Sequence, residues 1–204
     1  MDYRDYQNAR DTAWRILLDC NIDRLPVNLN TVCRKLKIRV LTYGQNTKLI
    51  ERACLSQAVH RTDGMTFYAG ETPIILFDEK ILPARAKFTV AHELGHIILG
   101  HVKSGSVTTL NREPHPKDAP EERAANQFAA RLLAPACVLW GLDVHTAEAI
   151  VELCHISNQA AQFRAQRIEE LYRRNKFLKS PLEREVYQKF QPFIRGYQHP
   201  PREE

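Results

Sequence analysis

One short string constrains this chain more than any other, the HELGH at residues 92–96. It has the form HExxH, and apolar residues recur with helical spacing around it from Pro83 to Leu99, which predicts a helix. Two histidines four positions apart lie one above the other on one helical face. Both imidazoles then reach a single metal ion at about 2.0–2.1 Å, and the glutamate borders the same face. The string therefore predicts a helix that carries metal chemistry.

The alternative is a pair of surface histidines on an amphipathic helix. Composition alone would produce an HExxH string in roughly one chain in fifty of this size. The surrounding residues, VAHELGHIIL, are apolar, and unpaired imidazoles in such surroundings are costly. We therefore favour the metal site.

A catalytic zinc site needs a third protein ligand and keeps its fourth position open. His101 is one candidate, because HELGHIILGH is close to the pattern HExxHxxGxxH in which a third histidine completes the site. Both the glycine and the final histidine are out of register by one residue, however. A residue just past a helix C-terminus, where the helix dipole favours a histidine, is the competing interpretation of His101.

The other candidate is a carboxylate on a second helix, predicted to start at Pro120 and to end before Pro135. Glu122 projects toward the apolar side of that helix, whereas Glu121 points further out and complements the helix dipole. We favour Glu122 as the third ligand and keep His101 as the alternative. Asn126 follows Glu122 by one turn, where its side chain can hydrogen-bond a ligand or the backbone.

The remaining pattern predicts an α+β fold. We expect helices over residues 3–19, 28–36, 83–99, 120–134, 146–154 and 157–174. We expect strands over residues 38–43, 56–60, 65–69 and 73–77, with a hairpin turn at Thr62-Asp63-Gly64. These strands make a small, mostly antiparallel sheet. Residues 101–118 are polar and predict a long loop.

Net charge and cysteine content further restrict the kind of protein and the compartment in which it works. The net charge of +5 permits contact with nucleic acid or an acidic partner but requires neither. Five scattered cysteines with no CxxC argue against both a disulfide framework and a cysteine zinc site. The start, MDYRDYQNARD, lacks the apolar core of a signal peptide, and no apolar run approaches the ~20 residues of a membrane span. We therefore expect a cytoplasmic protein.

FTVAHELGHIILGH followed by EERAANQFAARLLAP resembles the ImmA/IrrE family of zinc metallopeptidases. That family joins an HExxH helix to a later helix of the form E-x-x-A-N-x-F-A-x-x-L-L-x-P, which puts Glu122 in the ligand place. The similarity covers roughly residues 5–175. Ala124 stands where the family usually has Glu or Gln, and it lies off the metal face. The resemblance implies a zincin-like metallopeptidase core, which we assign to residues 1–141 with its two N-terminal helices.

The resemblance also implies a function. Relatives cleave, or are encoded beside, helix-turn-helix repressors of phages, mobile elements or stress operons, so we expect a regulatory endopeptidase with such a repressor as partner. Zinc held by His92, His96 and Glu122 would activate water, and Glu93 would act as general base. Tyr68, His101 and His115 are the candidates for a second oxyanion donor. The alternative is a non-catalytic, zinc-stabilised regulator or toxin-like partner that binds a repressor or DNA, and such a site would not need Glu93.

Residues 142–196 predict a helical C-terminal subdomain, followed by a flexible tail over 197–204. The helices at 146–154 and 157–174 resemble a helix-turn-helix, with Ser157 as a good N-cap. Three interpretations stay open, namely plain packing on the core, docking of the protein substrate, and DNA contact. We favour docking over DNA, through a set of arginines that follows: Arg164, Arg167, Arg173 and Arg174.

Overall fold

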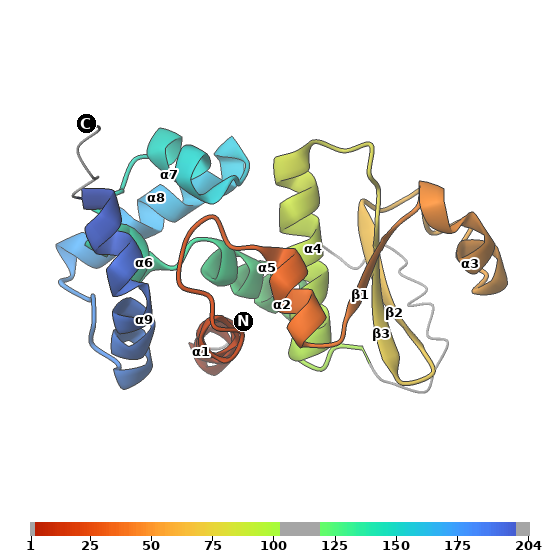
Figure 1. Cartoon of the computed structure of the whole chain (residues 1–204), viewed down its shortest axis with the longest axis horizontal. Coiled ribbons are helices and arrows are strands. Elements are labelled where there is room, and N and C mark those ends of the chain that lie inside the picture. The colour runs from red at the N-terminus through yellow and green to blue at the C-terminus, as the bar shows by residue number, and fades with distance from the viewer. Residues whose placement is uncertain (1–2, 103–118, 199–204) are drawn as a thin grey trace.

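The computed structural model describes residues 3–102 and 119–198 of the 204 residues, and the α+β class predicted from the sequence is confirmed (Figure 1). The elements, in chain order, are α1 (Tyr3–Asp19), α2 (Leu29–Lys35), β1 (Arg39–Thr42), η1 (Gly44–Asn46), α3 (Thr47–Arg52), β2 (Gly64–Ala69), β3 (Thr72–Phe77), α4 (Pro83–Ile98), α5 (Pro120–Leu133), α6 (Ala136–Gly141), α7 (Ala147–Cys154), α8 (Asn158–Arg173) and α9 (Pro181–Gln198). Among the described helices, none combines the length and the apolar composition that crossing a bilayer requires.

The sheet has three strands in the order β1-β3-β2, so β3 is central and both β1 and β2 are edges. β2 and β3 form an antiparallel hairpin, while β1 runs parallel to β3. The antiparallel prediction therefore holds for the β2–β3 pair only. The hairpin turns at Gly70, whose φ of +63° is a conformation that glycine adopts without strain.

The strand expected over residues 56–60 is wrong, because this segment forms turns after α3. Its sequence, SQAVH, holds few residues that favour strands, and only Val59 packs against the neighbouring apolar cluster. The expected turn at Asp63–Gly64 is wrong for the same reason, since Gly64 begins β2 and no strand precedes it there.

The long helices α1, α4, α5 and α8 agree closely with the sequence pattern. Asn28 caps α2 by accepting a hydrogen bond from the Thr31 amide at 3.1 Å. Pro83 and Pro120 occupy first-turn positions of α4 and α5, as predicted. The sequence pattern did not predict the short helices α3 and α6 or the full extent of α9. α9 ends at Gln198, and the rest of the expected tail lies outside the described residues.

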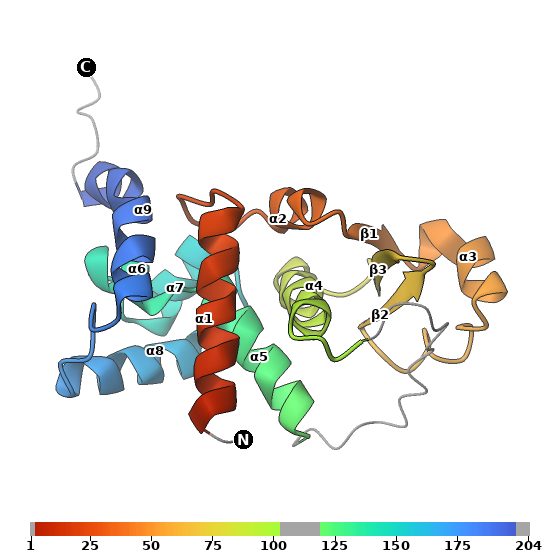
Figure 2. The ribbon, with the colours of Figure 1, turned by 90° about the horizontal axis from the view of Figure 1, so that it is seen from below.

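Helix α4 lies between the sheet on one side and α5 and α1 on the other, as both views show (Figure 2). Alternate residues of β3 account for this layering, since successive strand residues point to opposite faces. Ile75 belongs to the main apolar core with Leu94 of α4, whereas Ile74 and Leu76 face a smaller cluster that includes Ile50 of α3. α4 is therefore covered on both sides, and two of its polar residues, Glu93 and His96, are buried in the interior.

Two cations join the C-terminal helices to the helices that carry the sequence motifs. Lys87 of α4 donates to the carbonyl of Cys154, the last residue of α7, at 2.7 Å. Arg164 of α8 donates from Nε to the carbonyl of Ala134, just past the end of α5, at 2.5 Å. Burial lowers the pKa of the Lys87 ammonium. Both contacts place a positive charge at a helix C-terminus, where the helix dipole favours it.

Candidate metal centre

Helices α4 and α5 approach closely because the residue of α4 at their contact, Gly95, has no side chain. A Cβ at Gly95 would lie 3.1 Å from the Phe128 ring and 3.2 Å from Cα of Ala125, closer than ordinary packing allows. Glycine therefore permits the close approach that brings the polar residues of the two helices together.

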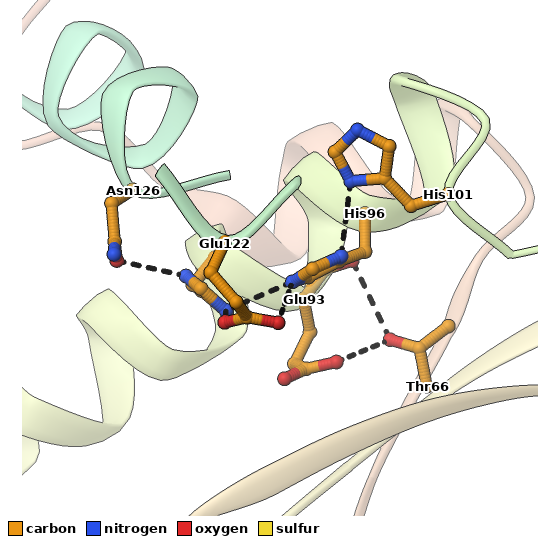
Figure 3. A network of polar contacts seen from close by, with 7 residues as sticks. Thr66, Glu93, His96, His101, Glu122 and Asn126 are labelled. Carbon is orange, nitrogen blue, oxygen red and sulfur yellow. Dashed lines mark hydrogen bonds and ion pairs between the residues drawn. The ribbon is translucent and has the colours of Figure 1, made fainter. Parts of the chain in front are cut away.

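Three groups capable of binding a metal meet between these helices (Figure 3). Nε2 of His92 lies 3.2 Å from Oε2 of Glu122, and Nε2 of His96 lies 3.3 Å from Oε1 of the same carboxylate. The two Nε2 atoms are 3.0 Å apart. Donors about 2.0–2.1 Å from one tetrahedral ion lie about 3.3–3.4 Å from each other, so the donor set fits a single ion. Among the described residues, this is the one group of three with that capacity.

The exposure of these side chains suits a catalytic rather than a sealed site. The His96 side chain is 2% exposed, whereas the His92 and Glu122 side chains are 14% and 16% exposed. One side of the donor set is therefore accessible from solvent, as a site with an open coordination position requires.

The far nitrogens of both histidines also have partners. Nδ1 of His92 lies 3.0 Å from Oδ1 of Asn126, one turn after Glu122 on α5. Nδ1 of His96 lies 3.0 Å from Nδ1 of His101, which follows α4. The structure thus brings Asn126 to a ligand candidate, as expected. The sequence left His101 as an alternative third ligand. In the structure His101 contacts the far nitrogen of His96 and is not a member of the group of three.

Glu93 lies on the sheet side of α4, and its side chain is buried. Its Oε2 accepts a hydrogen bond from the Thr66 hydroxyl at 2.9 Å, and Figure 3 shows Thr66 beside that oxygen. Thr66 is buried on β2 and pairs across the sheet with Ile75, which places it on the face that α4 covers. Sequence reasoning missed Thr66, since 27 positions separate it from Glu93 and no local pattern connects them.

The residues that the sequence suggested as a second oxyanion donor lie in different parts of the molecule. Tyr68 lies two residues after Thr66 on β2, hence on the same face of the strand. His115 lies outside the described residues. Tyr43 is a further phenol in this region, and burial raises its pKa to about 12, with the Glu93 carboxylate contributing in the same direction. A phenol with so high a pKa stays protonated at neutral pH, and its hydroxyl donates to the Thr62 carbonyl at 3.2 Å.

The four arginines expected to dock a partner do not share one surface. Arg164 is 3% exposed and binds the Ala134 carbonyl, so its predicted place on an exposed docking surface is corrected. Arg167 and Arg174 both pair with Glu170, and the hydrogen bond from Arg167 is the main cause of the lowered pKa of that carboxyl. Arg173 is exposed at the end of α8. A smaller set, without Arg164, remains available at the surface.

Comparison with known proteins assigns the chain to a family. The model of a peptidase family described as the IrrE N-terminal-like domain matches residues 33–166, about two thirds of the chain. The matched range includes both motif helices and most of α8, and it is narrower than the resemblance expected from the sequence. No curated protein matches the chain. The family match confirms the resemblance of the paired motifs.

Proposed function

Because the chain belongs to the peptidase family of the IrrE N-terminal-like domain, we propose that it is a zinc-dependent endopeptidase. The observation that carries the proposal is the convergence of His92, His96 and Glu122 on one point between α4 and α5. Two imidazoles and a carboxylate are the donor set of thermolysin-type zinc sites, which are catalytic. The carboxyl group of Glu93 beside this point adds the base that hydrolysis needs.

The residues divide the chemistry between them. His92, His96 and Glu122 hold zinc, which when bound supplies Lewis-acid chemistry that lowers the pKa of water and polarises a carbonyl. Glu93 accepts the proton of the attacking water and later transfers it to the leaving amine. Thr66 fixes the rotation of the Glu93 carboxylate by donating to Oε2. Asn126 orients the His92 ring through its far nitrogen.

The sheet provides a natural place for an extended substrate. β2 is an edge of the sheet, and no other strand of the described residues pairs with its outer side. A peptide that adds to this edge as a further strand gains main-chain hydrogen bonds without a requirement for particular side chains. Thr66 on this strand contacts Glu93, so such a peptide would run beside the proposed base.

We propose a regulatory role in the cytoplasm, with a helix-turn-helix transcriptional repressor of a phage, mobile element or stress operon as the substrate. Support comes from the ImmA/IrrE resemblance of the paired motifs. The alternative is a non-catalytic regulator that uses zinc for stability and acts by binding a repressor or DNA. The buried Glu93 beside the donor set favours the peptidase, because a structural metal site has no use for it.

Two measurements on the purified full chain test the proposal. Elemental analysis should give about one zinc ion per chain, and a library of extended peptides should be cleaved in a chelator-sensitive way that added zinc restores. Cleavage that persists in the metal-free chain would overturn the mechanism. One zinc ion without cleavage of either the library or intact repressors would favour the non-catalytic alternative.

A further inference from the structure

His101 stands in an unusual relation to His96, set by the way that α4 ends. The amide of Gly100 donates to the carbonyl of Ile97 at 3.1 Å, and the amide of His101 donates to the carbonyl of His96 at 2.9 Å. Gly100 has a φ of +76°. These features define a Schellman motif, in which the residue after the glycine packs against the residue five positions earlier. Here both of those residues are histidines.

The two rings meet through their Nδ1 atoms, which lie 3.0 Å apart, with the ring planes at 71° (Figure 3). A hydrogen bond between two ring nitrogens requires one to carry the proton and the other to offer its lone pair. A neutral His96 that binds a metal through Nε2 must carry its proton on Nδ1. His101 must then accept at Nδ1 and carry its own proton on Nε2.

We propose that His101 is a positioning residue of the metal centre, which selects the metal-binding tautomer of His96 and fixes its ring orientation. The inference rests on the proposed function, since it concerns the same metal site. His101 does for His96 what Asn126 does for His92, in each case by accepting at the nitrogen that faces away from the donor set. The ligand set is therefore supported from both ends, by α5 and by the turn after α4.

This role also explains the glycine and histidine that fall one position away from the three-histidine pattern. Gly100 ends the helix, and the residue that follows it is directed back to His96 rather than to the ion. A spacing that is wrong for a third ligand is right for an acceptor at the far nitrogen of the second ligand. The sequence HxxxGH thus combines a helix stop with support for a metal ligand.

The zinc affinity of the full chain, measured by competition with a chelator, tests the assignment. His101→Phe keeps a ring at this position but removes the acceptor, and we expect zinc affinity to fall about 10- to 100-fold. His101→Asn offers a carbonyl oxygen as Asn126 does, and it should recover most of that loss. His145→Ala is the matched control, because His145 has an exposed side chain on a separate segment, near Asp143. Its zinc affinity should equal that of the wild type.

Proton NMR of the cobalt-substituted chain distinguishes a positioning role of His101 from a role in packing alone, which would leave the spectrum unchanged. Each ligating imidazole carries one exchangeable ring N–H proton near the ion, so the wild type should show two such resonances. His101→Phe should broaden or remove one of them through exchange with water, while His101→Asn keeps both. Asn126→Ala should affect the other resonance.

The outcomes separate this inference from the proposed function. A wild-type chain that binds no metal overturns both. A wild type that binds zinc, together with a His101→Phe chain of equal affinity and two unchanged N–H resonances, overturns the role of His101 alone. Thermal unfolding of the metal-free variants checks that each has the wild-type fold, and His101→Asn keeps the test decisive if His101→Phe is unstable.

Discussion

The metal centre and helix α8 both carry charged or metal-binding side chains, but these side chains converge in the first and diverge in the second. Between α4 and α5, side chains from separate parts of the sequence converge on one point, and each of the two histidines has a partner at its far nitrogen. On α8, arginines from neighbouring positions diverge. Arg164 points into the core to a helix end, and Arg167 stays at the surface with Glu170.

The difference teaches which sequence patterns specify a position in space. Two ligands on one helix must be three or four positions apart for both to reach one ion, so the helix geometry itself restricts the spacing. Exposed arginines have no such requirement, because water satisfies a guanidinium wherever it points. A basic stretch therefore predicts charge at a surface but does not say which residues belong to it.

Glu122→Ala should break the convergent region most severely. Removing one of three ligands should reduce zinc affinity by more than the roughly 100-fold typical of outer partners, and hydrolysis should be lost with the metal. Chelator competition measures the affinity, with Glu121→Ala as the matched control on the neighbouring residue. Full zinc content in Glu122→Ala would show that another residue is the third ligand.

Glu93→Gln should separate metal binding from catalysis in the same region. The amide has the shape of the carboxylate but cannot accept the proton, so kcat should fall about 10²- to 10⁴-fold. Zinc content should stay at about one ion per chain. A variant that hydrolyses peptides at the wild-type rate would exclude Glu93 as the base.

Arg164→Met tests the divergent region through stability rather than activity. The variant loses a buried hydrogen bond from a charged group, and the free energy of unfolding should fall by about 2–3 kcal/mol in urea denaturation. Arg167→Met, three positions along the same helix, should change it by less than about 0.5 kcal/mol, since its ion pair is at the surface. Equal effects of the two changes would contradict the distinction between them.

Thr66→Val tests whether the sheet positions the base. Valine has nearly the shape of threonine, and the loss of its hydroxyl should lower kcat by about tenfold, which corresponds to ~1.4 kcal/mol. Zinc affinity should not change, because Thr66 contacts Glu93 rather than a ligand. Thr66→Ser keeps the hydroxyl and should retain most of the activity. Loss of metal in Thr66→Val would instead assign it a structural role.

The smallest effect is expected at the surface of α8 and beyond. Replacing Arg167, Arg173 and Arg174 together by Gln should weaken cleavage of the intact repressor by roughly three- to tenfold, since remote contacts raise the effective concentration of substrate. Cleavage of a short peptide that spans the same bond should be unchanged. An identical ratio of the two rates in wild type and variant would leave these arginines without a docking role.

Long-period patterns made much of this fold predictable. The apolar spacing and the first-turn prolines located α4 and α5, and the paired motifs indicated which of their residues meet. Arg164 could also have been placed from its pattern, because it shares the inward-facing stripe of α8 with Ala161 and Ile168. Its charge predicts exposure and its position on the helix predicts burial, and Arg164 is buried.

The unpredicted parts depend on contacts between distant segments. The parallel pairing of β1 with β3 and the hydrogen bond from Thr66 to Glu93 are set by how the sheet packs under α4. Residues 56–60 form turns because apolar and polar residues alternate only weakly there. The packing of Val59 against the neighbouring apolar cluster sets the course of the chain. Local propensity carries no information about such choices.

The hydrogen bond between Arg164 and the Ala134 carbonyl has a consequence for the order in which the chain is made. Its two partners are 30 positions apart, and the donor is the later one. Translation therefore delivers α5, with Glu122, before the residue that completes the buried end of this helix. On a ribosome, the ligand helix would emerge with its last turn unfinished, and only the arrival of α8 would complete it. A segment translated after both motif helices thus completes the C-terminal end of the helix that carries Glu122.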